Sequence, residues 1–231
     1  MTRIKICGLT NEQDVHLCAS AGADALGFVV EYPVEVPWNL NRETARRLMA
    51  RMPPFVTSVA VVGDDPDQVL GIAETVKPNV VQLHGREPFA VTAEMIRGLK
   101  SLGIGVIKAL RFSTDSGELD YDLADPIEAC HALAEAGADA IVADSFTRSR
   151  PAGTGKRFDW KVARFLGDKT PIPLILAGGL TAENVGRAIV EVNPYGVDVI
   201  SGVEGRDHKK DPDKVRAFVQ AVKSTRCRAG D

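Results

Sequence analysis

The stretch LILAGGLTAENV at residues 174–185, followed by GVDVISGVEG at residues 196–205, decides the fold of this chain of 231 residues. Each stretch contains a short apolar run that ends in a polar or glycine turn, which is the pattern of a buried strand. The same alternation of apolar runs with helix-length segments continues outward to both ends of the chain. Strands are expected near residues 3–7, 24–30, 55–62, 79–83, 104–109, 139–144, 173–177 and 196–200. Helices are expected near residues 11–21, 41–51, 66–76, 88–101, 124–136, 159–166, 181–192 and 211–223.

Eight such strand–helix units predict a (β/α)8 TIM barrel, an α/β fold that typically needs about 250 residues. A doubly wound open sheet is the alternative. That fold more often carries a GxGxxG turn after its first strand, and KICGLTNEQ at residues 5–13 has none. No linker or change of composition marks a domain boundary. We therefore expect one barrel domain over residues 1–223 and a flexible tail over residues 224–231.

The glycine-containing turns of the two opening stretches predict a phosphate site. Gly178 and Gly179 follow one strand, Ser201 and Gly202 follow the next, and Thr181 is expected to be the N-cap of the helix between them. Glycine allows the backbone to approach a ligand closely, and free N–H groups at two adjacent strand ends suit an anion. The alternative is that the glycines serve only the tight turns.

Composition argues against several classes of function. The net charge of −3, with both signs interspersed, is unlike a nucleic-acid or membrane-surface protein. No apolar run reaches the roughly 18 residues that span a bilayer, and the N-terminus does not resemble a signal peptide. A cytoplasmic protein with reduced thiols is expected, either a monomer or a homodimer. The cysteines show no metal-ligand spacing: they are Cys7, Cys18, Cys130 and Cys227.

Charged residues in the predicted strands should face the barrel interior, because the helix layer is apolar. This rule points Arg3, Lys5 and Cys7 inward and places Cys7 at the carboxyl end of the first strand, where barrel enzymes carry their chemistry. Lys5 and Lys108, which is also expected to face inward, could lower the pKa of the thiol and make Cys7 a thiolate base. The alternative is that Cys7 is simply a small buried residue.

The same rule points Asp144 into the mouth at the end of the strand at residues 139–144. A base and an acid on opposite sides of a pocket suit the removal of a proton from carbon and the delivery of one to oxygen. Asp144 could instead brace the next loop. His84 is expected to line the mouth or to be a structural histidine, and Asp198 is expected to be a buried acid paired with Lys5. The long segment at residues 145–160, which contains GTGK, is expected to be a lid that reaches a phosphate, or a solvated loop.

Motifs along nearly the whole chain resemble the phosphoribosylanthranilate isomerases of the tryptophan pathway. These motifs are KICGLT (5–10), GADALGFV (22–29), VQLHG (81–85), VIKA (106–109), GTGKRFDW (153–160), LAGGLTAENV (176–185) and GVDVISGVE (196–204). The resemblance implies that Cys7 is the general base and Asp144 the general acid of an Amadori rearrangement, an aldose–ketose isomerisation. It also implies a phosphorylated sugar substrate bound at the two turns, without a metal or cofactor.

One segment departs from the family pattern. Family members carry a basic segment after the second strand, with an arginine for the anthranilate carboxylate. This chain has EYPVEVPWNLNRE at residues 31–43, with Trp38 near that position. A tryptophan can stack on an aromatic ring, but it cannot form a charge-assisted fork with a carboxylate. Either Arg111 or Arg42 replaces the arginine, or the substrate ring carries no carboxylate. The substrate-binding residues predicted are Lys5, Trp38, His84, Arg111, Gly178, Gly179, Ser201 and Gly202.

Three other functions compete with this hypothesis. An Amadori isomerase for a different phosphoribosyl amine would keep the chemistry and change the ring. A pentose-phosphate epimerase commonly needs a metal with His and Asp ligands, and only His84 lies at a predicted strand end. A non-catalytic barrel that senses a phosphorylated metabolite would need neither Cys7 nor Asp144.

Overall fold

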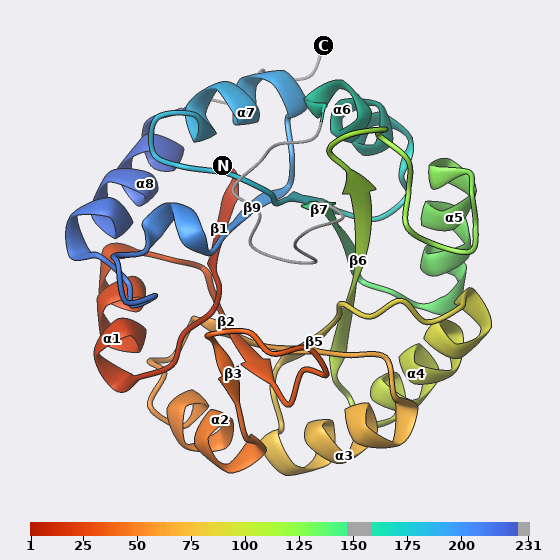
Figure 1. The fold of residues 1–231 in the computed structure, drawn as a ribbon, viewed down its shortest axis with the longest axis horizontal. Coiled ribbons are helices and arrows are strands. Elements are labelled where there is room, and N and C mark those ends of the chain that lie inside the picture. Colours follow the sequence, from red (N-terminus) through yellow and green to blue (C-terminus); the bar gives the residue numbers. More distant parts are fainter. Residues whose placement is uncertain (147–158, 226–231) are drawn as a thin grey trace.

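The computed structural model describes residues 1–146 and 159–225. Parallel strands form a closed barrel that is ringed by helices (Figure 1). The strand order is β1-β9-β8-β7-β6-β5-β4-β2, and pairing between β1 and β2 closes the barrel. A further strand, β3, is added to β2 at the edge. The strands are β1 (Arg3–Ile6), β2 (Ala25–Val30), β3 (Asn39–Leu40), β4 (Thr57–Val62), β5 (Val80–Leu83), β6 (Gly105–Ser113), β7 (Ala140–Phe146), β8 (Leu174–Leu176) and β9 (Gly196–Val199).

Helices follow the strands in the expected alternation, which confirms the predicted (β/α)8 barrel. Three of them begin with the pair Asp-Pro, in which the aspartate caps the helix and the proline occupies a first-turn position. The carboxylate accepts backbone N–H groups of the first turn, and the proline lacks an N–H that would need a partner. The helices are α1 (Glu12–Ala21), α2 (Arg42–Met49), α3 (Pro66–Val76), α4 (Phe89–Ser101), α5 (Pro126–Ala136), α6 (Trp160–Lys169), α7 (Val185–Val192) and α8 (Pro212–Ser224).

The start of α7 differs from the prediction. Asn184, not Thr181, is the N-cap of this helix. The Thr181 carbonyl accepts the N–H groups of Asn184 and Val185, and the Asn184 side chain accepts the Thr181 N–H at 3.0 Å. Thr181 therefore opens a turn before the helix. The last helix also ends later than expected, because α8 continues to Ser224.

Two layers of side chains fill the structure, as the alternation along each strand predicts. Ile4 and Ile6 belong to the large apolar cluster between the strands and the helices. Ile107 and Ala109 belong to a separate small cluster with residues of β7 and β8 inside the barrel.

The expectation for Lys108 is wrong. Because Ile107 and Ala109 face the interior, Lys108 faces the helix layer, where it is fully buried. Its Nζ donates to Glu87 Oε1 at 2.7 Å and to the Gly85 carbonyl at 3.2 Å, and it lies 5.3 Å from the centre of the Tyr121 ring.

Within residues 1–146 and 159–225, no helix combines the length and apolarity needed to cross a membrane. The same residues contain no group of three or more His, Cys, Asp or Glu side chains placed to hold a metal ion. Most of the predicted lid segment and most of the predicted tail, including Cys227, lie outside the described residues.

Candidate active site

Cys7 and Asp144 line one cavity at the carboxyl end of the barrel. Cys7 directly follows β1, and Asp144 lies near the end of β7. The interior faces of these strands bring the two side chains together across the mouth, as the sequence predicts. Other side chains that line the cavity are those of Val29, Tyr32, Val36, Trp38, Val61, Gln82, His84, Asp198 and Ile200.

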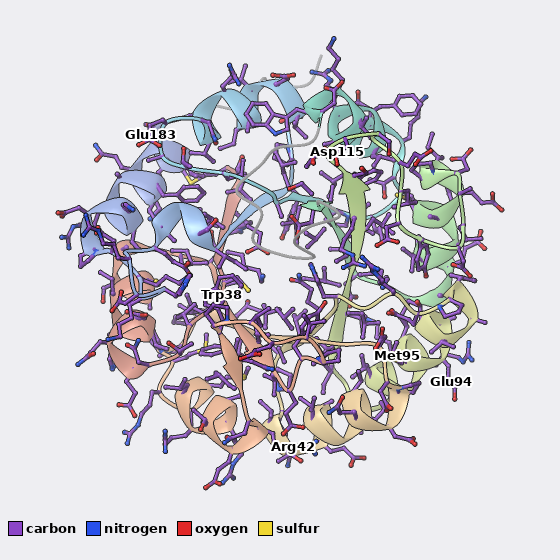
Figure 2. The ribbon with its side chains drawn as sticks, in the orientation of Figure 1. Trp38, Arg42, Glu94, Met95, Asp115 and Glu183 are labelled. Atoms are coloured by element: carbon purple, nitrogen blue, oxygen red, sulfur yellow. The ribbon has the colours of Figure 1, made fainter. Side chains whose placement is uncertain are left out.

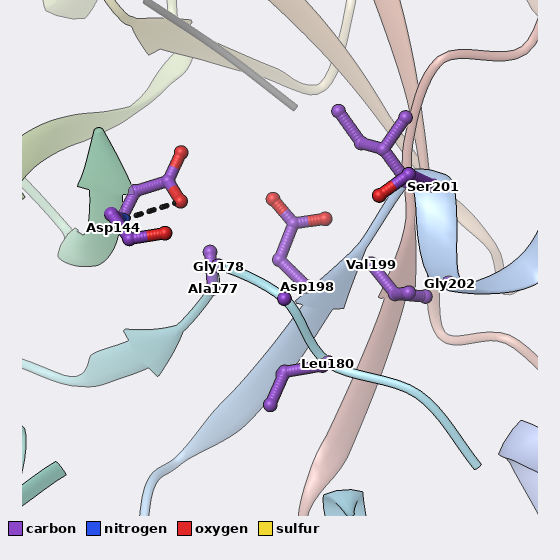
Figure 3. A pocket seen from close by; sticks show the side chains of 11 residues that line it. Asp144, Ala177, Gly178, Leu180, Asp198, Val199, Ser201 and Gly202 are labelled. Atoms are coloured by element: carbon purple, nitrogen blue, oxygen red, sulfur yellow. Dashed lines mark hydrogen bonds between the residues drawn. The ribbon is translucent and has the colours of Figure 1, made fainter. Parts of the chain in front are cut away.

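A second cavity adjoins the first and shares Asp144, Asp198 and Ile200 with it. All four residues predicted for the phosphate site line this second cavity: Gly178, Gly179, Ser201 and Gly202. In Figure 3, Asp144 lies on one side of the hollow and Ser201 and Gly202 lie on the other. The phosphate turns and the candidate acid therefore face a common space.

The glycines of these turns are required by the geometry. Gly178 and Gly179 have φ values of +88° and +62°, which other residues rarely adopt. A Cβ at Gly178 would overlap the Ser145 side chain, and a Cβ at Gly202 would overlap the Leu180 carbonyl oxygen. The two turns thus approach each other so closely that only glycine fits between them.

Lys5 lies beneath Cys7 and is paired with Asp198. Its Nζ lies 2.7 Å from Asp198 Oδ2, and both side chains are buried, as expected from the sequence. Burial favours a neutral lysine, but the charge of Asp198, together with that of Cys7 once the thiol is ionised, outweighs burial and raises the pKa of Lys5 to about 12. Lys5 therefore stays positive beneath the thiol.

The expectation of a lowered pKa for the Cys7 thiol is wrong. Burial raises the pKa of Cys7 above its ordinary value, and the nearby charge of Lys5 lowers it by less. Asp198 also opposes the effect of Lys5, because its carboxylate raises the pKa of the same thiol. Cys7 is a protonated thiol at neutral pH.

Burial raises the pKa of Asp144 to about 6, although a hydrogen bond from the Ser145 N–H and the charges of Arg111 and Lys5 lower it. His84 Nε2 lies 3.7 Å from Asp144 Oδ2, which is too long for a hydrogen bond. Burial, together with the positive charges of Arg111, Lys108 and Lys5, lowers the pKa of His84 to about 3. A neutral histidine thus stands beside a carboxyl group that titrates near pH 6.

Trp38 and Arg42, both in the segment that departs from the family pattern, lie in different places. Trp38 is buried and borders the cavity beside Cys7, whereas Arg42 lies at the outer rim (Figure 2). The Arg42 guanidinium forms a two-pronged pair with Glu31, with contacts of 2.9 and 2.6 Å.

Arg111 lies on the interior face of β6, opposite Asp144 in the β6–β7 register. Its Nη2 donates to Asp120 Oδ2 at 2.8 Å, and the same carboxylate oxygen lies 3.1 Å from Arg86 Nε. Two arginines thus contact the same carboxylate oxygen of Asp120.

Sequence reasoning missed several residues of the site. Tyr32 and Gln82 line the first cavity, and Glu204 accepts a hydrogen bond from the Trp38 indole at 2.6 Å. Gln82 and Glu204 do lie within motifs that carry the resemblance, VQLHG and GVDVISGVE. Their positions could have been singled out from these motifs, but their contacts could not.

Comparison with known proteins gives a consistent result over nearly the full chain. A family model described as N-(5'phosphoribosyl)anthranilate (PRA) isomerase matches residues 4–221. An N-(5'-phosphoribosyl)anthranilate isomerase of Haloferax volcanii is 42% identical over 227 residues, which are 98% of this chain and 95% of the relative.

Two solved structures extend the comparison. A phosphoribosyl anthranilate isomerase in complex with reduced 1-(o-carboxyphenylamino)-1-deoxyribulose 5-phosphate is 36% identical, with a TM-score of 0.75, and the match covers 96% of this chain and 99% of that one. A structure described as monomers generated from the dimeric enzyme of Thermotoga maritima is 33% identical, with a TM-score of 0.75 and the same coverage.

Proposed function

Since this chain belongs to the N-(5'-phosphoribosyl)anthranilate isomerase family and catalyses that isomerisation in tryptophan biosynthesis, we propose that Cys7 is its general base and Asp144 its general acid. One observation carries the assignment: both side chains line the same cavity, and Asp144 also borders the phosphate turns. A sugar whose phosphate occupies the turns would then lie between the thiol and the carboxyl group.

The reaction needs one proton delivered to oxygen and one removed from carbon. Protonated Asp144 gives its proton to the ribose ring oxygen. The bond from this oxygen to C1' breaks, and the nitrogen lone pair forms the C1'=N bond of a Schiff base. Cys7 as thiolate takes the C2' proton, and the electrons of that C–H bond form C1'=C2' while the nitrogen recovers its lone pair. The resulting enolamine tautomerises to the 1-deoxyribulose ketone. The substrate nitrogen is the electron sink, and each acid–base step contributes roughly 10²–10⁴-fold.

Lys5 and His84 support these two groups in the proposal. Lys5 remains charged beneath Cys7, so its field stabilises the thiolate when that forms. His84 remains neutral beside Asp144, so it does not stabilise the carboxylate by an ion pair. A neutral histidine thereby leaves the carboxyl group able to hold its proton.

The experiment that tests the function is turnover of N-(5'-phosphoribosyl)anthranilate by the purified protein, with Cys7→Ala and Asp144→Asn as matched variants. Growth of a tryptophan auxotroph that carries the gene is the companion test. Absence of turnover by the wild type would reject the substrate, and turnover by the variants as fast as that of the wild type would reject the assigned residues.

The phosphate is bound by the backbone N–H groups around Gly178, Gly179, Ser201 and Gly202 in this proposal, which is supported by the second cavity. Gly202→Ala is expected to raise KM and to weaken inorganic phosphate binding by roughly tenfold or more, because the added Cβ would push the two turns apart. Isothermal titration with phosphate measures this.

Gly167→Ala is the control for that change. It adds the same methyl group in α6, where the nearest atom would be 3.9 Å away. Its phosphate affinity is expected to equal that of the wild type, with stability unchanged or slightly higher. Equal phosphate affinity in Gly202→Ala and Gly167→Ala would contradict the assignment of the turn.

Arg111 binds the anthranilate carboxylate in this proposal, and Trp38 forms a wall of the ring subsite. The support is the place of Arg111 on the interior face of β6 opposite Asp144, together with the place of Trp38 beside Cys7. Arg42 is the less suitable candidate, because its guanidinium is already paired with the Glu31 carboxylate at the outer rim.

Arg111→Gln is expected to lower kcat/KM for N-(5'-phosphoribosyl)anthranilate by roughly 10²-fold, through loss of a charge-assisted pair. For N-(5'-phosphoribosyl)aniline, which lacks the carboxylate, the loss is expected to be less than about threefold. Arg42→Gln serves as the matched control and should change neither rate. An equal loss on both substrates would show that Arg111 does not bind the carboxylate.

Structural relatives bind a phosphorylated sugar analogue and include both dimeric and monomeric forms. For this chain we favour the homodimer, joined at the amino-terminal mouth of the barrel. Phe55 is fully exposed there, held outward by backbone with a φ of +69°, at the edge of a cavity of about 520 Å³. A protruding aromatic ring next to a hollow is self-complementary under a two-fold axis.

Phe55→Asp is therefore expected to convert the protein to a monomer by light scattering, with kcat/KM nearly unchanged, because the site is at the opposite end. Val34→Asp is the control, since Val34 is also exposed but lies outside this face. A wild-type monomer at micromolar concentration would reject the homodimer.

The proposed location is the cytoplasm, because the base must be a reduced thiol.

A further inference from the structure

Glu204 is a buried carboxylate with three polar side-chain neighbours. Its Oε1 accepts from Trp38 Nε1 at 2.6 Å and from Lys210 Nζ at 2.8 Å, and its Oε2 lies 3.4 Å from His208 Nδ1. The side chains of Glu204 and Lys210 are almost entirely shielded from solvent. The positive charge of Lys210 offsets the cost of burying the Glu204 carboxylate. The hydrogen bond from the Trp38 indole is not needed for that ion pair, so it calls for a separate explanation.

The position of Glu204 in the chain connects it to the phosphate turn. It directly follows the 3₁₀ turn η1 (Ser201–Val203), whose first two residues line the phosphate cavity. The Glu204 N–H donates to the Ser201 carbonyl at 3.2 Å, and Lys214 Nζ donates to the Glu204 carbonyl at 2.6 Å. The backbone of Glu204 is therefore part of the same hydrogen-bonded turn.

The other end of the connection is the wall of the catalytic cavity. Trp38 lines the cavity with Cys7, and its ring packs so closely on Gly8 that a Cβ there would lie 2.9 Å from Trp38 Cδ1. The segment that carries Trp38 leaves β2, while Glu204 follows β9, so one hydrogen bond joins the ends of the two strands that flank β1.

We propose that Glu204 is a positioning residue that ties the Trp38 wall of the ring subsite to the phosphate turn. This rests on the proposed function, because it concerns how the aromatic ring of that substrate is placed. The phosphate turn and the ring wall would then move as one unit, so that a bound phosphate places the anthranilate ring against Trp38 and C2' against Cys7. A tryptophan without this hydrogen bond could not fix the distance between the ring subsite and the phosphate turn.

Two variants separate this role from a merely structural ion pair. Trp38→Phe keeps an aromatic ring and the Glu204–Lys210 pair but removes the N–H that Glu204 accepts. Glu204→Gln keeps the Oε1 acceptor for Trp38, and its amide can face His208, but it leaves Lys210 buried without a countercharge. The proposal predicts opposite results for the two variants.

Trp38→Phe is expected to keep a melting temperature near that of the wild type and to bind reduced 1-(o-carboxyphenylamino)-1-deoxyribulose 5-phosphate about tenfold more weakly. Its affinity for ribulose 5-phosphate, which has no aromatic ring, should not change. Glu204→Gln is expected to melt at a lower temperature and yet to bind the aromatic analogue, at a temperature where it is folded, within about twofold of wild type.

Tryptophan fluorescence tests the connection to the phosphate turn directly. The chain has two tryptophans, so Trp160→Phe leaves Trp38 as the sole emitter. Inorganic phosphate is expected to change its emission saturably, and Glu204→Ala in the same background should abolish the change while calorimetry still detects phosphate binding.

Tight analogue binding by Trp38→Phe, or phosphate binding without any change in Trp38 emission, would overturn the proposal. Neither result would contradict the assigned reaction. That reaction is contradicted by a different result, which is that the wild type does not turn over N-(5'-phosphoribosyl)anthranilate.

Discussion

Cys7→Ala is expected to lower kcat/KM for N-(5'-phosphoribosyl)anthranilate by a factor on the order of 10²–10⁴, because the variant lacks the group that takes the C2' proton in this proposal. Cys7→Ser should be nearly as slow, since a hydroxyl ionises far less readily than a thiol. Steady-state rates at saturating and limiting substrate measure the effect. The loss should appear in kcat, because the thiol acts in the transition state.

Cys130→Ala is the matched control for this variant. Cys130 is also a free, buried thiol, but it belongs to α5 in the outer apolar layer. Its removal is expected to cost some stability and to leave kcat/KM within about twofold of wild type. A Cys7→Ala enzyme that keeps a tenth or more of the wild-type rate would contradict the assignment of the base.

Asp144→Asn is expected to cause a loss of similar size, on the order of 10²–10⁴ in kcat/KM, and to change the shape of the pH profile. The amide occupies the same volume but has no proton to give to the ring oxygen. The pH profile is the more specific measurement, because a merely distorted site would lower the rate without shifting the pH values at which the profile bends.

The expected wild-type profile follows from the two shifted pKa values. Asp144 titrates at about 6 and Cys7 above its ordinary range, so the acid loses its proton before the base does. The reactive form, with Asp144 protonated and Cys7 ionised, is a minor species. Its share rises with pH up to about 6, stays level until the thiol ionises, and then falls.

In Asp144→Asn the group that titrates near pH 6 is gone, so the level region should disappear. The residual rate is expected to keep rising tenfold per pH unit until Cys7 ionises. A variant profile that still bends near pH 6 would mean that another group causes the bend, and Asp144 would not be the acid.

The same variant should be more stable than the wild type at alkaline pH. The pKa of Asp144 is raised in the folded state from 3.8 to about 6, so this group favours folding when protonated and loses that contribution as pH rises through about 6. The ionised carboxylate then costs on the order of 2–3 kcal/mol. Urea unfolding at pH 4 and pH 8 should show Asp144→Asn gaining stability relative to wild type only at the higher pH.

Much of this molecule follows from local patterns in the chain. The predicted barrel rests on alternation and on signals such as the Asp-Pro helix starts, and each is a matter of a few neighbouring residues. Strand alternation also places Cys7 and Asp144 on interior faces, and parallel strands necessarily bring these faces to one mouth. The glycines of the phosphate turns are identifiable for the same reason, because backbone conformation is a local property.

The remaining features depend on atoms that are distant in the chain. Cys7 has a raised pKa because burial outweighs the charge of Lys5, and desolvation depends on every element packed around the thiol. Lys108 faces outward because the interior positions of β6 belong to its neighbours. The hydrogen bond from Trp38 to Glu204 joins residues 166 positions apart. Spacing in the sequence carries no information on such pairings, since they form only when the barrel closes.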